Sequence, residues 1–217
     1  MISKNKSQKI TKKFLIKLGR MKGMYVTPEL NTILYLQTKN IKKIENLEKY
    51  INLKTLYLNN NNIKKITGLE KLIQLEFLSL SHNSISKIEN LDSLIFLEEL
   101  DLSYNIISKI ESISFEITNI LKYLPNILLL DISGNSQLLQ FDPFLANKIL
   151  FCCPNLKNLN SNSIDWKQKK LAFAWIKGGN DLQNEVYLQI QEIEKEKERK
   201  RLNDFIEQFE LDNSDLI

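Results

Sequence analysis

A short phrase recurs three times between residues 53 and 105, as LKTLYLNNNNI, LEFLSLSHNSI and LEELDLSYNII. The copies keep a constant interval of 22 residues, which is shared by Leu58, Leu80 and Leu102 and by Asn61, Asn83 and Asn105. Because apolar positions and an asparagine stay in one register, equivalent residues must occupy equivalent environments. The recurrence therefore predicts a stack of similar turns rather than a core assembled from dissimilar elements.

Each copy contains a stretch with strand periodicity. In the second repeat, Leu56 and Leu58 alternate with Tyr57, so the leucines are expected to point inward and the tyrosine outward. No single copy can bury its own apolar edge, so neighbouring copies must stack and pair their strands in parallel. The pattern L-x-x-L-x-L-x-x-N-x-I is that of the leucine-rich repeat, an α/β solenoid with its strands on the concave face.

The recurring asparagine follows each strand at a turn. Its side-chain amide can bond backbone groups that the turn leaves without partners. The sequence predicts a structural asparagine ladder, made of Asn61, Asn83, Asn105 and Asn135.

The repeats change towards both ends. Lys39 occupies the asparagine position of a first, atypical repeat. A fourth repeat, beginning at Leu97, is eight residues longer than the others, and apolar spacing over residues 112–123 predicts a helix there. A second helix is expected over residues 144–152, before a truncated last strand at residues 156–159. About six parallel strands result.

Five segments are expected. Residues 1–9 are basic and predicted to be disordered, residues 10–30 form an N-terminal capping helix, and residues 31–160 are the repeats. Residues 161–179 form a C-terminal cap in which Trp166, Phe173 and Trp175 seal the open end of the core, and Gly178 and Gly179 end its helix. Residues 180–217 form a charged helical tail.

Composition excludes several classes of function. The net charge of +4 does not by itself favour nucleic acid. The N-terminus lacks a signal-peptide apolar segment, and no apolar run approaches the ~20 residues that span a bilayer. An intracellular protein without membrane contact is therefore expected. We also expect a monomer. His82 has no nucleophile or metal-ligand set beside it, and adjacent Cys152 and Cys153 imply no disulfide framework. No enzyme, cofactor or metal is predicted.

The outward strand positions carry aromatic residues toward the N-terminal end and acids toward the C-terminal end. Aromatic anchors beside charges are typical of binding hot spots. We predict a partner-binding concave face made of Tyr35, Tyr57, Phe77, Glu99, Asp101 and Asp131. The alternative is that these side chains have no binding function, because every repeat must place some residue at each outward position.

A second set of positions is basic and consists of Lys43, Lys65, Lys87 and Lys109. Glu45, Glu89 and Glu111 lie two residues further on and offset much of this charge. A solvated, self-compensating edge is the simplest interpretation, and a basic edge for an acidic partner such as a microtubule surface is the alternative.

The flanks carry a more specific signal than the repeats. The segments 11–50, with TPELN and IENLE, and 166–179, with AWIKGG, resemble the leucine-rich-repeat dynein axonemal assembly factors of cilia and flagella. The resemblance implies a cytoplasmic protein that helps to preassemble dynein arms, with dynein arm subunits or assembly co-chaperones as partners and an association with the axoneme or microtubules. Two alternatives stay open: a targeting subunit of a protein phosphatase, and a structural axonemal protein that binds microtubules.

Overall fold

The computed structural model describes residues 7–107, 121, 123–136 and 144–214. The chain divides into two compact units, residues 1–165 and residues 166–217. The first unit holds the repeats and the second is helical.

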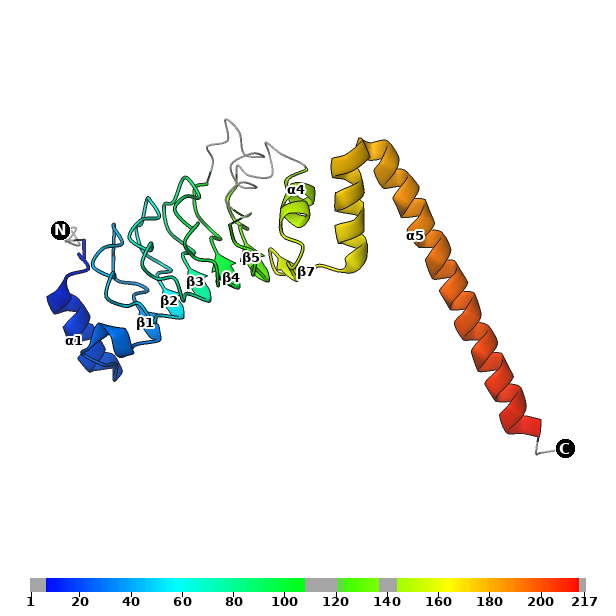
Figure 1. Ribbon diagram of the computed structural model, residues 1–217, viewed down its shortest axis with the longest axis horizontal. Coiled ribbons are helices and arrows are strands. Elements are labelled where there is room, and N and C mark those ends of the chain that lie inside the picture. Colours follow the sequence, from blue (N-terminus) through cyan, green and yellow to red (C-terminus); the bar gives the residue numbers. More distant parts are fainter. Residues whose placement is uncertain (1–6, 108–120, 122, 137–143, 215–217) are drawn as a thin grey trace, which may run out of the picture. The chain divides into compact units, whose positions relative to one another are not determined.

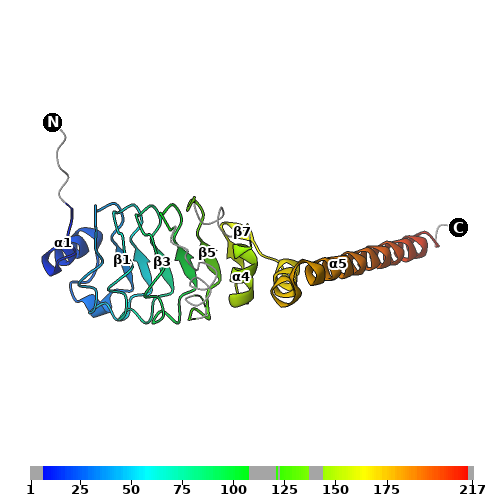
Figure 2. The same ribbon diagram turned by 90° about the horizontal axis from the view of Figure 1, so that it is seen from above.

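The first unit is built on one sheet of short strands that follow chain order, as Figures 1 and 2 show. Five parallel pairings join the first six strands, and the seventh pairs antiparallel with the sixth. The strands are β1 (Ile33–Tyr35), β2 (Thr55–Tyr57), β3 (Phe77–Ser79), β4 (Glu99–Asp101), β5 (Leu129–Asp131), β6 (Asn158–Leu159) and β7 (Asn162–Ser163). The predicted leucine-rich-repeat solenoid with six parallel strands is confirmed, and β7 is an addition.

The core consists of the repeated leucines and isoleucines. Leu56 and Leu58 are fully buried and their equivalents in the other strands are buried, while Tyr57 between them is half-buried. The same alternation holds in each of the first five strands except at Ser79, which is buried as well. Strand periodicity therefore places one row of side chains inside and leaves the neighbouring rows on the concave face.

The N-terminal end is closed by α1 (Lys12–Lys22) and the 3-10 turn η1 (Pro28–Leu30). Thr11 caps α1 by accepting from the backbone N–H of Phe14 at 3.1 Å, and Gly23 ends the helix in the left-handed conformation. Gln8 lies in the segment that we expected to be disordered, but it forms a parallel bridge to Ile41. A free backbone edge on the first repeat explains this pairing, because its groups need hydrogen-bond partners.

One further helix is described in the first unit, α4 (Leu145–Cys152), which agrees with the expectation for residues 144–152. Burial, with a smaller contribution from neighbouring Cys152, raises the pKa of the Cys153 thiol to about 12. This thiol therefore behaves as a small apolar side chain rather than a nucleophile. The helix predicted over residues 112–123 falls almost entirely outside the described residues.

The second unit is the helix α5 (Trp166–Ser214), which is interrupted by non-helical backbone at Gly178 and Gly179. Gly179 has φ 67° and ψ −154°, a conformation open essentially to glycine alone. Across this kink, Lys167 pairs with Glu194, and Gln183 donates to the carbonyl of Leu171 at 3.3 Å. The glycine pair thus reverses the helix so that its two arms contact each other. Whether the predicted cap at residues 161–179 seals the repeat core stays a prediction.

Candidate functional site

The concave face carries two rows of outward side chains whose order is fixed by the parallel register. The first row runs along Tyr35, Tyr57, Ser79, Asp101 and Asp131. The second runs along Ile33, Thr55, Phe77, Glu99, Leu129 and Asn158. All six residues predicted for the binding face therefore lie on one side of one sheet.

The aromatic residues form a continuous stack. The rings of Tyr35 and Tyr57 lie parallel with centroids 5.3 Å apart, and Phe77 is tilted against Tyr57 at 5.1 Å. Stacked and tilted pairs at this spacing are favourable arrangements of aromatic rings. The stack gives the N-terminal half of the concave face an apolar surface that is held in place by its own contacts.

The acidic residues differ in how firmly they are held. Asp101 accepts from the hydroxyls of Ser79 at 3.0 Å and Ser103 at 2.6 Å, and from the backbone N–H of Ser103 at 3.0 Å. Asp131 accepts from the backbone N–H of Ser133 at 2.9 Å. Glu99 has no hydrogen-bond or ion-pair partner within the described part of the chain. These bonds fix Asp101 and leave accepting capacity on Asp131 and Glu99.

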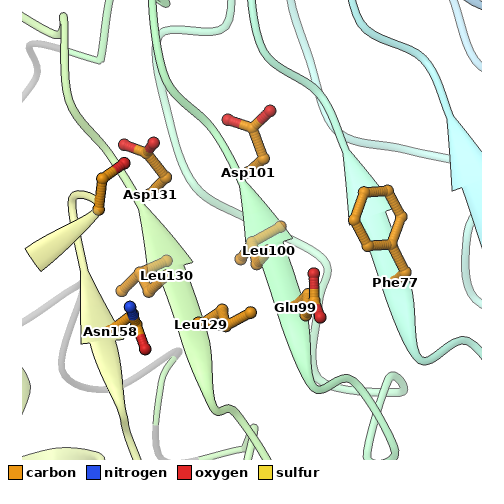
Figure 3. A pocket seen from close by; sticks show the side chains of 9 residues that line it. Phe77, Glu99, Leu100, Asp101, Leu129, Leu130, Asp131 and Asn158 are labelled. Atoms are coloured by element: carbon orange, nitrogen blue, oxygen red, sulfur yellow. The ribbon is translucent and has the colours of Figure 1, made fainter. Parts of the chain in front are cut away.

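A cavity of about 380 Å³ lies between these groups. Its lining combines apolar and acidic side chains and ends at the β6–β7 hairpin, as Figure 3 shows. The lining residues are Phe77, Glu99, Leu100, Asp101, Leu129, Leu130, Asp131, Asn158 and Ser161. The concave face is thus hollowed at the junction of its aromatic and acidic halves.

The predicted asparagine ladder lies just behind this face. The four amides are between 4% and 9% exposed. In Asn83, Oδ1 accepts from the backbone N–H of Ile63 at 2.9 Å, and Nδ2 donates at 3.0 Å to the carbonyls of Leu58 and Leu80. Equivalent bonds are made by Asn61, Asn105 and Asn135. Each amide therefore connects its own repeat to the preceding one.

Sequence reasoning missed two features of this region. Asn160 accepts from the backbone N–H of Ile132 at 2.9 Å, where the sheet is ending. His82, for which the sequence analysis found no neighbouring nucleophile or metal ligands, is exposed and stacks on Tyr104 with ring centroids 4.4 Å apart. Both residues of this stack have positive φ, at the same position of successive repeats. The 22-residue interval between His82 and Tyr104 is the sequence signal that could have predicted their contact.

The predicted basic edge is described only in part. Lys43, Lys65 and Lys87 are exposed and lie outside the strands. Lys109 falls outside the described residues. Lys43, Lys65 and Lys87 therefore do not contribute to the concave face.

Two absences hold for the part of the chain that the structure describes. No group of three or more histidine, cysteine or acidic residues is arranged to hold a metal ion. Nor is any helix there both long enough and apolar enough to cross a membrane.

The stacked parallel strands, the inward leucines and the buried amides give this chain a leucine-rich-repeat fold. The family described as Leucine Rich repeats (2 copies) matches residues 73–115. The chain is 46% identical over 52 residues to dynein axonemal assembly factor 1 of Rattus norvegicus, and 46% identical over 48 residues to that of Homo sapiens. The predicted resemblance to the dynein axonemal assembly factors is confirmed over the 52 residues shared with the rat protein.

These matches are local. The stretch shared with the rat protein spans 24% of this chain and 8% of that protein, and the human match spans 22% and 7%. Among solved structures, the Drosophila melanogaster SNF/U2A′ complex contains a chain that aligns with a TM-score of 0.62 at 21% identity. That alignment covers 82% of this chain and 99% of the other. At this identity the similarity supports the fold alone.

Proposed function

We propose that this protein is a non-catalytic protein-interaction scaffold that acts in the cytoplasmic preassembly of axonemal dynein arms. The observation that carries the proposal is the 46% identity to dynein axonemal assembly factor 1 over 52 residues. Leucine-rich-repeat solenoids present extended concave surfaces that bind other proteins. Dynein arm subunits or their assembly co-chaperones are the proposed partners, with the cytoplasm and the cilium or flagellum as the locations.

The concave face is the proposed binding surface. The aromatic stack of Tyr35, Tyr57 and Phe77 supplies a preorganised apolar anchor. The acids beyond it supply charge that selects among partners. Binding through this face needs no reactive group, which suits a scaffold.

The test is disruption of the gene in ciliated or flagellated cells of the source organism. Cilia should form but lack dynein arms when sections are viewed by electron microscopy, and the wild-type gene should restore the arms. Normal arms in the disrupted cells would contradict the proposal. Recovery of a protein phosphatase catalytic subunit as the main partner in affinity purification would favour the phosphatase-targeting alternative.

A matched pair of rescue variants tests the surface. Tyr57→Ala removes the middle ring of the stack, and rescue should fail although the protein accumulates. Ile73→Ala removes an exposed apolar side chain outside the strands, which is 48% exposed, and rescue should succeed. Rescue by both variants would remove the concave face from the proposal while leaving the role in assembly intact.

A further inference from the structure

At the acidic end of the concave face, the described strand positions carry no compensating cation. None of the residues at 33–37, 55–59, 77–81, 99–103 and 129–133 is lysine or arginine. Asp101 and Asp131 are direct neighbours across β4 and β5, and Glu99 lies two residues from Asp101 on the same face. Like charges opposite each other on adjacent strands are unfavourable. The cation that would relieve this arrangement must come from outside the strands.

The cavity that these acids line is not purely polar. Phe77 and Leu129 flank Glu99 on the two neighbouring strands. Figure 3 shows Asp101 and Asp131 side by side, with Phe77 on the next strand from Asp101. A ligand for this cavity therefore needs an apolar portion to lie along Phe77 and Leu129 and a positive end to reach the carboxylates.

We propose that the cavity at β3–β6 binds an arginine side chain from a segment of the protein partner. This proposal deepens the proposed function, because it states the chemistry of the partner that the scaffold holds. The arginine stem packs on Leu129, and the guanidinium group lies against the Phe77 ring and donates to Glu99 and Asp131. A guanidinium group stacks on aromatic faces and donates in a planar fork, whereas a lysine ammonium is a strongly hydrated point charge.

Asp101 has a different role in the proposed arginine site. Its oxygens already accept three hydrogen bonds from Ser79 and Ser103, so it shapes the cavity and adds negative potential. Glu99 and Asp131 retain accepting capacity and are the groups that contact the guanidinium. Residues flanking the arginine in the partner would lie along the stack of Tyr35, Tyr57 and Phe77.

The test uses the full chain, residues 1–217, and random 12-residue peptides displayed on phage. Enriched peptides should share an arginine. One enriched peptide is then synthesised with arginine and with citrulline, a neutral side chain of nearly the same shape. Fluorescence anisotropy should show binding about tenfold weaker with citrulline, as expected for a lost charge-assisted hydrogen bond.

The matched protein variants are Glu99→Gln with Asp131→Asn, and Glu89→Gln with Asp92→Asn. The first pair should weaken the arginine peptide about tenfold but leave the citrulline peptide nearly unchanged, since the lost interaction needs both partners. The second pair removes the same charge outside the strands and should change the Kd less than about twofold.

Four outcomes would overturn the proposal: no enrichment, enriched peptides without arginine, equal binding of the citrulline peptide, or equal weakening by both variant pairs. All of these are measured with purified protein and peptide. They are therefore distinguishable from failure of the role in dynein arm assembly, which is read from cilia.

Discussion

The two sides of the same strands follow opposite rules. On the inward side, the same residues recur: leucine at the centre of each strand from β1 to β5, and asparagine at the turn that follows each strand from β2 to β5. On the outward side, the residues opposite one another change from Tyr35 and Tyr57 to Ser79 and then to Asp101 and Asp131. The inward side must satisfy the same neighbours in each repeat, whereas the outward side chains are free of that constraint.

If the concave face binds as proposed, this difference separates stability from recognition along a single three-residue strand. A residue such as Leu78 is fully buried, while Phe77 before it is half-exposed. Substitutions on the inward side should therefore change the free energy of unfolding strongly, and those on the outward side should change binding.

The largest effect is expected for Asn83→Ala. The substitution leaves the backbone N–H of Ile63 without its acceptor and removes donors from the carbonyls of Leu58 and Leu80. Buried groups left without partners cost about 1–3 kcal/mol each, and partial relaxation leaves a loss of about 3 kcal/mol. Urea unfolding followed by circular dichroism measures it.

The matched control is Asn59→Ala, because Asn59 lies at an outward position just after β2. The Asn59 side chain makes no hydrogen bond within the described residues, so its removal should change stability by less than about 0.5 kcal/mol. A similar loss in both variants would break the distinction between the two sides.

The second prediction concerns the backbone turns away from the strands. Asn46, Gly68 and Asn90 occupy equivalent positions and all have positive φ. At Gly68, a Cβ would come within 2.8 Å of the Ile44 carbonyl oxygen. Gly68→Ala should cost about 2 kcal/mol, because an unfavourable φ adds to a backbone clash.

Gly23→Ala separates these two causes. Gly23 has φ 68°, but a Cβ there meets nothing within 4 Å. Its substitution should cost only about 1 kcal/mol, the conformational part. If thermal unfolding shows equal losses at Gly23 and Gly68, the close approach to Ile44 is not a constraint.

Much of this molecule could be predicted from sequence because the 22-residue interval fixes the register. Once Leu58, Leu80 and Leu102 are equivalent, the outward rows and the positions of the ladder amides follow by counting. The contacts between rings do not follow, since spacing assigns Tyr57 and Phe77 to neighbouring strands but not their side-chain rotamers.

The ends of the sheet were harder to predict for the same reason. The bridge at Gln8 and the β6–β7 hairpin have no counterpart in another repeat, so no interval points to them. The hairpin turns through Asn160 and Ser161, which have φ 51° and 64°. Asparagine adopts this left-handed conformation more readily than most residues, but serine does not, so Ser161 gave no sequence signal for the turn. The cavity depends on this hairpin, and so the sequence indicated an acidic surface without indicating a pocket.

The third prediction lies on the outward side. Tyr57→Ala removes the ring between Tyr35 and Phe77 and should cost about 1–2 kcal/mol, from lost ring contacts and half-buried area. Tyr57→Phe should stay within about 0.5 kcal/mol, because the hydroxyl makes no hydrogen bond within the described residues. Thermal unfolding of both variants measures the difference. A large loss in Tyr57→Phe would show that the hydroxyl, not the ring, is what the position requires.

The smallest effect is expected for the double variant Glu99→Gln with Asp131→Asn. Removing two like charges beside Asp101 relieves repulsion, while a neutral amide in place of the Asp131 carboxylate accepts the Ser133 N–H less strongly. The two changes oppose each other, so urea unfolding should differ from wild type by less than about 0.5 kcal/mol. Raising the salt concentration should shift the balance toward wild type, because it screens the repulsion that the variant lacks. A loss above about 1 kcal/mol would mean that the outward acids stabilise the sheet, and the separation of stability from recognition would then fail at this end of the concave face.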